Sequence, residues 1–171
     1  MARPPACVVI RNLLTPAQYR LARAVAIRRA RSPSDPLVDE NPLCGRRYVH
    51  NDPLLKGIHQ ALEPRAEQLS GMPIKKSFSF LSLYGPDGIA PPHKDRLASR
   101  FVINVCLHQD KTWPIYVEKE EFLLGENDAI FFCGSRLVHH RPKIEGRFCR
   151  MGSFFFVSRK YRGALCRPGR E

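Results

Sequence analysis

Two short segments in the second half of the sequence carry side chains that can hold a metal ion. The first is His93-Lys94-Asp95. In an extended segment, residues i and i+2 project to the same side, so the imidazole and the carboxylate converge while Lys94 turns away. The second is His139-His140, which follows a strand-like apolar run and offers a further imidazole. Two imidazoles and one carboxylate suit Fe(II) and leave coordination positions open, so the pattern predicts a non-haem iron centre.

Only one of the two adjacent histidines can take part, because neighbouring residues of a strand project to opposite sides. A His-x-Asp triplet also occurs in proteins that bind no metal, where the histidine is a hydrogen-bonded surface or core residue. The order along the chain favours the metal site over that reading. The triplet comes first, several strand-like runs follow, and the histidine pair then precedes a group of arginines, Arg141, Arg147 and Arg150.

Short strands are the elements that must position these residues. From residue 74 onward, apolar and aromatic runs alternate with turns rich in Gly, Pro and Asp, which is typical of an all-β sandwich or barrel. The expected strands cover residues 78–84, 101–107, 114–117, 121–124, 129–133 and 148–157.

The first part of the chain instead predicts a short strand over residues 6–10 and two helices. Thr15 supplies an N-cap, the following proline suits the first helical position, and Gln18 completes a capping box. We expect this helix to end at Pro33 and a loop rich in Pro, Asp and Ser to cover residues 32–42.

A second helix is expected to start at Asp52-Pro53, where the same capping logic applies, and Pro64 should kink or end it. The two helices would then cover one face of a sheet. The 171 residues fit one domain. We divide it into an N-terminal strand and helices (1–72), a β core (73–158) and a basic C-terminal tail (159–171).

The chain is strongly basic, with 28 Lys and Arg against 16 Asp and Glu, a net charge of +12. Such an excess could attract nucleic acid, an acidic carrier protein or a small anion, or could reflect an arginine-rich genome. The first helix is expected to expose Arg20, Arg23, Arg28 and Arg29. A nucleic-acid-binding or repair protein is therefore one alternative. Against it, the basic residues are spread along the chain without an interleaved aromatic platform.

The six cysteines form no CxxC pair, which excludes zinc-ribbon and thioredoxin-like sites. No secretory signal is evident, and no apolar run approaches the ~20 residues of a membrane span. We therefore expect reduced thiols, a cytoplasmic location and no membrane partner.

Taken in order, these segments resemble a known enzyme family. The matching residues are 83–88 (LYGPDG), 93–96 (HKDR), 113–117 (WPIYV), 124–129 (LGENDA), 134–141 and the aromatic strand 153–157. They are similar to the core of the Fe(II)/2-oxoglutarate-dependent oxygenases, and most of all to the prolyl-hydroxylase-like branch. The resemblance implies a mainly β fold, a double-stranded β-helix of the jelly-roll or cupin type, with N-terminal helices packed on one sheet.

The resemblance also implies roles for single residues. His93 and Asp95 match the proximal metal ligands of the family, and His139 matches the distal histidine because of its offset from Gly134. A cation should anchor the far carboxylate of 2-oxoglutarate through paired hydrogen bonds.

Several residues could serve that cosubstrate. Arg147 and Arg150 lie eight and eleven residues after His139, on either side of the usual anchor position. Arg141 is a third candidate. Tyr84 could supply a hydroxyl near the cosubstrate or be a core aromatic residue.

The resemblance implies hydroxylation of an unactivated C–H bond, with Fe(II) as the cofactor, 2-oxoglutarate and O2 as the cosubstrates, and succinate and CO2 as the co-products. Desaturation or ring formation are other outcomes of the same chemistry. Because the chain is small, we expect a free small-molecule or amino-acid substrate first, and one attached to a peptide or an acidic carrier protein second. A non-catalytic metal-binding β-barrel is the remaining alternative.

Overall fold

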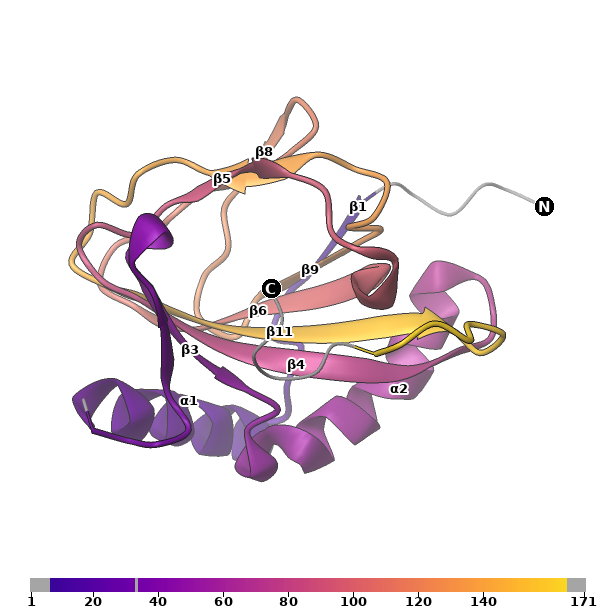
Figure 1. The fold of residues 1–171 in the computed structure, drawn as a ribbon, viewed down its shortest axis with the longest axis horizontal. Helices are drawn as coiled ribbons and strands as arrows, with labels where there is room; N and C mark the ends of the chain where they lie inside the picture. The colour runs from indigo at the N-terminus through magenta and orange to yellow at the C-terminus, as the bar shows by residue number, and fades with distance from the viewer. Residues whose placement is uncertain (1–6, 33, 166–171) are drawn as a thin grey trace.

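The larger of two antiparallel sheets lies between two helices and the smaller sheet (Figure 1). The structure is a computed structural model that describes residues 7–32 and 34–165. The larger sheet has the strand order β1-β9-β6-β11-β4-β3-β2. Its strands are β1 (Cys7–Ile10), β2 (Asp39–Asn41), β3 (Arg46–His50), β4 (Ile74–Tyr84), β6 (Phe101–Gln109), β9 (Ala129–Phe132) and β11 (Cys149–Ser158).

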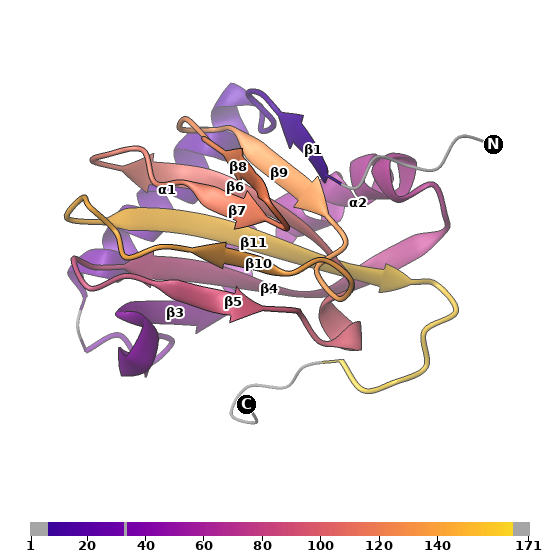
Figure 2. The same ribbon diagram turned by 90° about the horizontal axis from the view of Figure 1, so that it is seen from above.

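The smaller sheet lies across the opposite side and has the order β5-β10-β7-β8 (Figure 2). Its strands are β5 (Ala90–His93), β7 (Ile115–Val117), β8 (Glu120–Phe122) and β10 (His139–Arg141). Two facing antiparallel sheets with the chain crossing between them are the arrangement of a jelly roll. Short 3-10 turns η1 (Pro42–Cys44), η2 (Pro53–Leu55) and η3 (Leu97–Ser99) lie among the connections.

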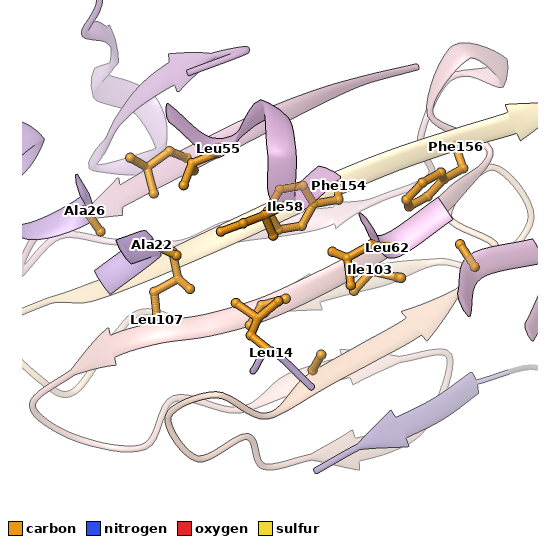
Figure 3. Close-up of a cluster of buried hydrophobic side chains, with 14 of the residues drawn as sticks. Leu14, Ala22, Ala26, Leu55, Ile58, Leu62, Ile103, Leu107, Phe154 and Phe156 are labelled. Carbon is orange, nitrogen blue, oxygen red and sulfur yellow. The ribbon is translucent and has the colours of Figure 1, made fainter. Parts of the chain in front are cut away.

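Helices α1 (Pro16–Arg31) and α2 (Lys56–Ser70) cover the outer face of the larger sheet, as expected from the sequence. Thr15 caps α1, and Gln18 completes the capping box. The helices bury their apolar faces against side chains of β6 and β11 (Figure 3). The contacting residues include Ala22, Ala26, Ile58, Leu62, Ile103, Leu107, Phe154 and Phe156. Burial of each large side chain contributes roughly 1.5–3 kcal/mol to stability.

The second helix departs from the expectation at both ends. Asp52 caps the 3-10 turn η2, accepting a hydrogen bond from the Leu54 amide at 2.9 Å, and α2 begins only at Lys56. Pro64 lies inside α2 and does not end it, because packing on the sheet supports the helix around the missing hydrogen bond. The helix ends at Gly71, whose positive φ of 65° lets its amide reach the Glu67 carbonyl.

Two strands were not expected from the sequence, β2 and β3, whereas β5 and β10 carry the histidines that were expected on extended segments. The loop expected over residues 32–42 contains β2 and the start of η1. These strands are short, and β2 and β3 are rich in charged residues because they lie toward the edge of their sheet. β5 carries two prolines, which an edge strand tolerates because their missing N–H groups are not needed there.

Arg29 was expected on the exposed face of the first helix, and that expectation is wrong. The residue is only 7% exposed. Its guanidinium pairs with Asp35 and with Asp52, whose carboxylate lies 2.8 Å from Nε. Two carboxylates from the following segments therefore draw this side chain into the protein.

The described cysteines, Cys7, Cys44, Cys106, Cys133 and Cys149, are free thiols. Residue 6 of the expected first strand, Pro33, Cys166 and the end of the basic tail lie outside the described residues. Within the described ranges, neither helix is long and apolar enough to cross a membrane.

Candidate active site

A cavity of about 460 Å³ lies between the two sheets, and the residues of interest gather around it. Ligand pockets typically measure about 300–1,000 Å³, so the cavity can hold small molecules. Its walls come from both sheets, with β5 and β10 on one side and β4 and β11 on the other.

The structure brings His93, Asp95 and His139 together at this cavity. One nitrogen or oxygen atom of each residue lies within 4.8 Å of the corresponding atoms of the other two. His93 and His139 are direct neighbours across the β5–β10 pair, and Asp95 follows β5 by two residues. The antiparallel pairing of two short strands therefore places both imidazoles side by side, with ring centroids 4.3 Å apart.

Both imidazoles are oriented for metal binding by backbone carbonyls. Nδ1 of His93 donates to the Pro91 carbonyl at 2.7 Å, and Nδ1 of His139 donates to the Leu137 carbonyl at 3.1 Å. Each Nε2 is left facing Asp95, 3.8 Å from its Oδ1 atom. Metal-binding histidines are held in this way, because a hydrogen bond at one ring nitrogen fixes the lone pair of the other.

The carboxylate of Asp95 lacks the partners that a buried charge needs. Its Oδ2 atom is buried and has no hydrogen-bond partner among the described residues. Burial raises the pKa of Asp95 to about 6, opposed by the nearby His93, and burial lowers the pKa of His139 to about 4. A divalent cation would supply the missing charge. The three side chains thus fit a metal ion with two nitrogen ligands and one oxygen ligand.

His140 lies apart from this group. Its ring stacks on Tyr116 with centroids 4.9 Å apart, and it does not join the cluster of three ligands. The alternation along β10 therefore directs His139, and not His140, toward Asp95.

Among the three candidate arginines, Arg141 reaches the cavity. It follows His139 by two residues on β10, lines the cavity and is only 4% exposed. Its Nη1 donates to the Trp113 carbonyl at 2.6 Å, and its guanidinium lies 4.9 Å from the Trp113 ring centre. No carboxylate of the described residues pairs with it, so a positive charge is buried in the cavity that His93, Asp95 and His139 line.

The other two arginines face a different depression. Arg147 has a side chain that is 85% exposed and pairs with Asp110. Arg150 donates to the Tyr84 carbonyl at 3.3 Å, and both arginines line a surface depression beside β3. Tyr84 itself is buried, packs edge-on against Trp113 and lines the cavity between the sheets.

Two further residues, Gly134 and Arg46, belong to the site, although the sequence did not predict their positions there. Gly134 lies against Asp95: a Cβ atom at this position would fall 2.0 Å from Oδ2 of Asp95. Arg46 lines the cavity from β3. The place of Gly134 directly after an apolar strand could have indicated its role. Arg46 could not have been found in this way, because it lies on β3, a strand that the sequence did not predict.

Comparison with solved structures identifies the fold. AviO1 from Streptomyces viridochromogenes Tue57 has a TM-score of 0.74 and 18% identity, over 95% of this chain and 94% of that one. A Pseudomonas putida prolyl-4-hydroxylase has a TM-score of 0.71 and 15% identity, over 90% and 93%.

SnoN, a non-haem α-ketoglutarate-dependent epimerase from nogalamycin biosynthesis, has a TM-score of 0.73 and 14% identity, over 91% and 78%. Another SnoN structure contains Fe3+, α-ketoglutarate (2-oxoglutarate) and nogalamycin RO. The chain therefore has the double-stranded β-helix fold of these enzymes, as the sequence predicted. No protein-family model matches the sequence, and no curated protein matches it in sequence.

Proposed function

We propose that this chain is an Fe(II)- and 2-oxoglutarate-dependent dioxygenase that hydroxylates an unactivated C–H bond of a small molecule or amino acid. The observation that carries the proposal is one cavity that joins His93, Asp95 and His139 to the buried, unpaired guanidinium of Arg141. Bound iron, with 2-oxoglutarate and O2, supplies the oxidising power for such a reaction, and succinate and CO2 are the co-products.

The protein's own contribution to this reaction is positional. The carbonyls of Pro91 and Leu137 hold the two imidazoles, and the Gly134 region holds Asp95, whose amide donates to the Gly134 carbonyl at 2.9 Å. His93, Asp95 and His139 would hold the metal at the wall of the cavity, where a small molecule could reach it.

Arg141 is the residue best placed to anchor the far carboxylate of 2-oxoglutarate. A guanidinium binds a carboxylate through two parallel hydrogen bonds, which fixes both position and orientation. Arg141 shares its strand with the metal ligand His139, so one short element would position both ends of the cosubstrate. The apolar walls formed by Ile115 and Met151 would exclude water around it.

The reaction that we propose is hydroxylation. Because the fold is similar to that of an epimerase as well as a hydroxylase, analysis of the product is the measurement that distinguishes the two reactions. The modest cavity supports a free small molecule or amino acid over a whole protein, with a carrier- or peptide-bound residue as the next choice. The free thiols of the described cysteines support a reducing compartment such as the cytoplasm.

Anaerobic titration with Fe(II) and then 2-oxoglutarate tests the proposal. A weak visible charge-transfer band should appear only after both are added, and O2 should then convert 2-oxoglutarate to succinate. Asp95→Ala should lose the band. Asp87→Ala, which removes an exposed carboxylate paired with Lys143 outside the cavity, should keep it. A folded wild-type protein that retains no iron and shows no band would exclude this function.

A further inference from the structure

A group of aromatic rings forms the wall of the cavity on the larger sheet. Phe78 and Phe80 on β4 and Phe155 on β11 line the cavity and contact one another, with centroids between 4.7 and 6.0 Å apart. Tyr48 and His50 extend this group along β3, each packing on Phe80 at 5.3 Å. This part of the cavity can therefore receive the apolar or ring-shaped body of a ligand.

Arg46 lies at the edge of these rings, on the same side of β3 as Tyr48 and His50. Its Cζ atom is 4.9 Å from the centre of the Tyr48 ring and 5.6 Å from that of Phe80. Contact with an aromatic face holds a guanidinium in place through cation–π attraction. Because the N–H groups of a guanidinium lie in its plane, stacking leaves its edges available to an anion.

The Arg46 side chain lacks a partner for its charge. No carboxylate of the described residues pairs with it, and its buried Nε has no hydrogen-bond partner among them. A buried cation without an anionic partner is unfavourable, so an anionic ligand that binds this guanidinium would supply the partner that its charge lacks.

The cavity as a whole is positively charged. Its described lining residues include the cations Arg46, Lys94, Arg96 and Arg141, and Asp95 is the one carboxylate among them. Since Asp95 is engaged with the metal in the proposed function, the remaining lining favours anions.

The two cavity guanidinium groups occupy different walls. Arg141 extends from the smaller sheet to within 4.0 Å of the Met151 sulfur on β11. Arg46 extends from β3 over Tyr48 and Phe80. The two guanidinium groups thus contact different side chains, and since the proposed function assigns Arg141 to the cosubstrate, Arg46 is left for a second anionic group.

We propose that the substrate is an anion with an apolar, ring-bearing body. Arg46 binds its carboxylate or phosphate group, and Phe78, Phe80 and Phe155 hold its body beside the metal. Calling this anion the substrate rests on the proposed function. The anion-binding site itself is inferred from Arg46 and the aromatic rings alone.

Calorimetric titration of the full chain with matched probes tests the site. The probes are 3-phenylpropionate, 2-phenylethyl phosphate, the neutral 3-phenylpropionamide and the cationic 3-phenylpropylamine. We expect at least about tenfold tighter binding of an anionic probe than of the amide or the amine, the value of a charge-assisted hydrogen-bond pair. The stronger of the two anions identifies the anionic group.

Variants locate the anion. Arg46→Met should remove most of the preference for the anionic probe while leaving amide binding unchanged, and Arg46→Lys should restore part of it. Phe80→Leu should lower the affinity for the anionic probe and for the neutral amide alike. Arg141→Met should leave the preference intact, because Arg141 belongs to the cosubstrate end.

Three results would overturn the proposal: no binding of either anionic probe, equal affinity for anion and amide, or loss of the preference in Arg141→Met instead of Arg46→Met. The charge-transfer band with Fe(II) and 2-oxoglutarate is measured separately. If the band appears but the anionic probes are not preferred, only this inference is contradicted. If the anionic probes are preferred but no band appears, the oxygenase function is contradicted and the anion site remains.

Discussion

The carboxylate of Asp95 occupies the space that a side chain on Gly134 would fill. The Asp95 amide donates to the Gly134 carbonyl at 2.9 Å, and its Oδ2 atom lies 2.0 Å from the ideal Cβ position of Gly134. The Asp95 carboxylate is thus positioned by a residue 39 positions away that contributes only backbone. This contact makes a glycine part of the proposed metal site.

Gly134→Ala should therefore lower metal affinity while the fold is kept. The new methyl group must displace the Asp95 carboxylate, and supporting residues of metal sites typically change affinity about 10–100-fold. Competition between the protein and a coloured chelator for Fe(II) measures the change. Gly57→Ala is the matched control, since a Cβ at this α2 position meets no atom within 4 Å. It should leave metal affinity unchanged and stabilise the helix by roughly 0.5–1 kcal/mol. Wild-type metal affinity in Gly134→Ala would show that this close approach does not matter.

Arg141→Met should raise the 2-oxoglutarate concentration needed for half-maximal succinate formation by about 10–100-fold. The reason is the loss of a charged hydrogen-bond pair, which contributes about 1.5–3 kcal/mol. Arg147→Ala and Arg150→Ala serve as controls, because these arginines line the depression outside the cavity. If either control showed the larger effect and Arg141→Met none, the anchor would have been assigned to the wrong arginine.

The buried Arg29–Asp52 pair should matter for stability and not for the site. The Arg29 and Asp52 side chains are 8% and 0% exposed. Asp52→Ala leaves the guanidinium with only one of its two carboxylates, and breaking such a pair costs about 3–5 kcal/mol. Urea unfolding followed by circular dichroism measures it. The exposed Asp87–Lys143 pair provides the comparison, and Asp87→Ala should cost less than about 1 kcal/mol. Similar decreases in unfolding free energy for Asp52→Ala and Asp87→Ala would mean that burial does not determine how much the Arg29–Asp52 pair stabilises the protein.

His59 should make the protein less stable in weak acid. It is buried in α2 against Phe154 and Phe156 and donates from Nε2 to the Phe155 carbonyl at 3.1 Å. Burial lowers the pKa of His59 to about 4, and the charge of Lys76 on β4 acts in the same direction. In the unfolded chain, His59 therefore binds a proton below its ordinary pKa of about 6.5. In the folded protein, the buried imidazole stays neutral over the same pH range.

Stability from this group is accordingly complete above pH ~6.5 and is lost as the pH falls toward ~4, by on the order of 3 kcal/mol. Unfolding free energies at several pH values should fall more steeply for the wild type than for His59→Gln. Parallel curves for the two proteins would exclude His59 as the titrating group.

The parts predicted well from the sequence are those governed by local chemistry. The capping box at Thr15 and Gln18 marks the start of α1, and the apolar runs give the long strands β4, β6 and β11. The His-x-Asp triplet indicated that His93 and Asp95 converge, which the structure shows, because alternation along an extended segment is a local property.

The parts that were missed depend on tertiary contacts. β3 consists of Arg46-Arg47-Tyr48-Val49-His50, which lacks an apolar run and becomes a strand by pairing with β4. Arg29 lies on a helix face that looks exposed until Asp35 and Asp52 come to it. Which of the three arginines lines the cavity likewise depends on the path of the chain between β10 and β11, which spacing alone does not give.

The position of β11 in the larger sheet has a consequence for synthesis of the chain. This strand is the last in sequence, yet it lies between β6 and β4 and pairs with both. Until residues 149–158 have left the ribosome, the sheet exists only as two separate halves with unpaired inner edges. Residues 149–158 must therefore be synthesised before the sheet can close, and we infer that premature stops ahead of this strand yield chains prone to aggregation rather than partly active enzyme.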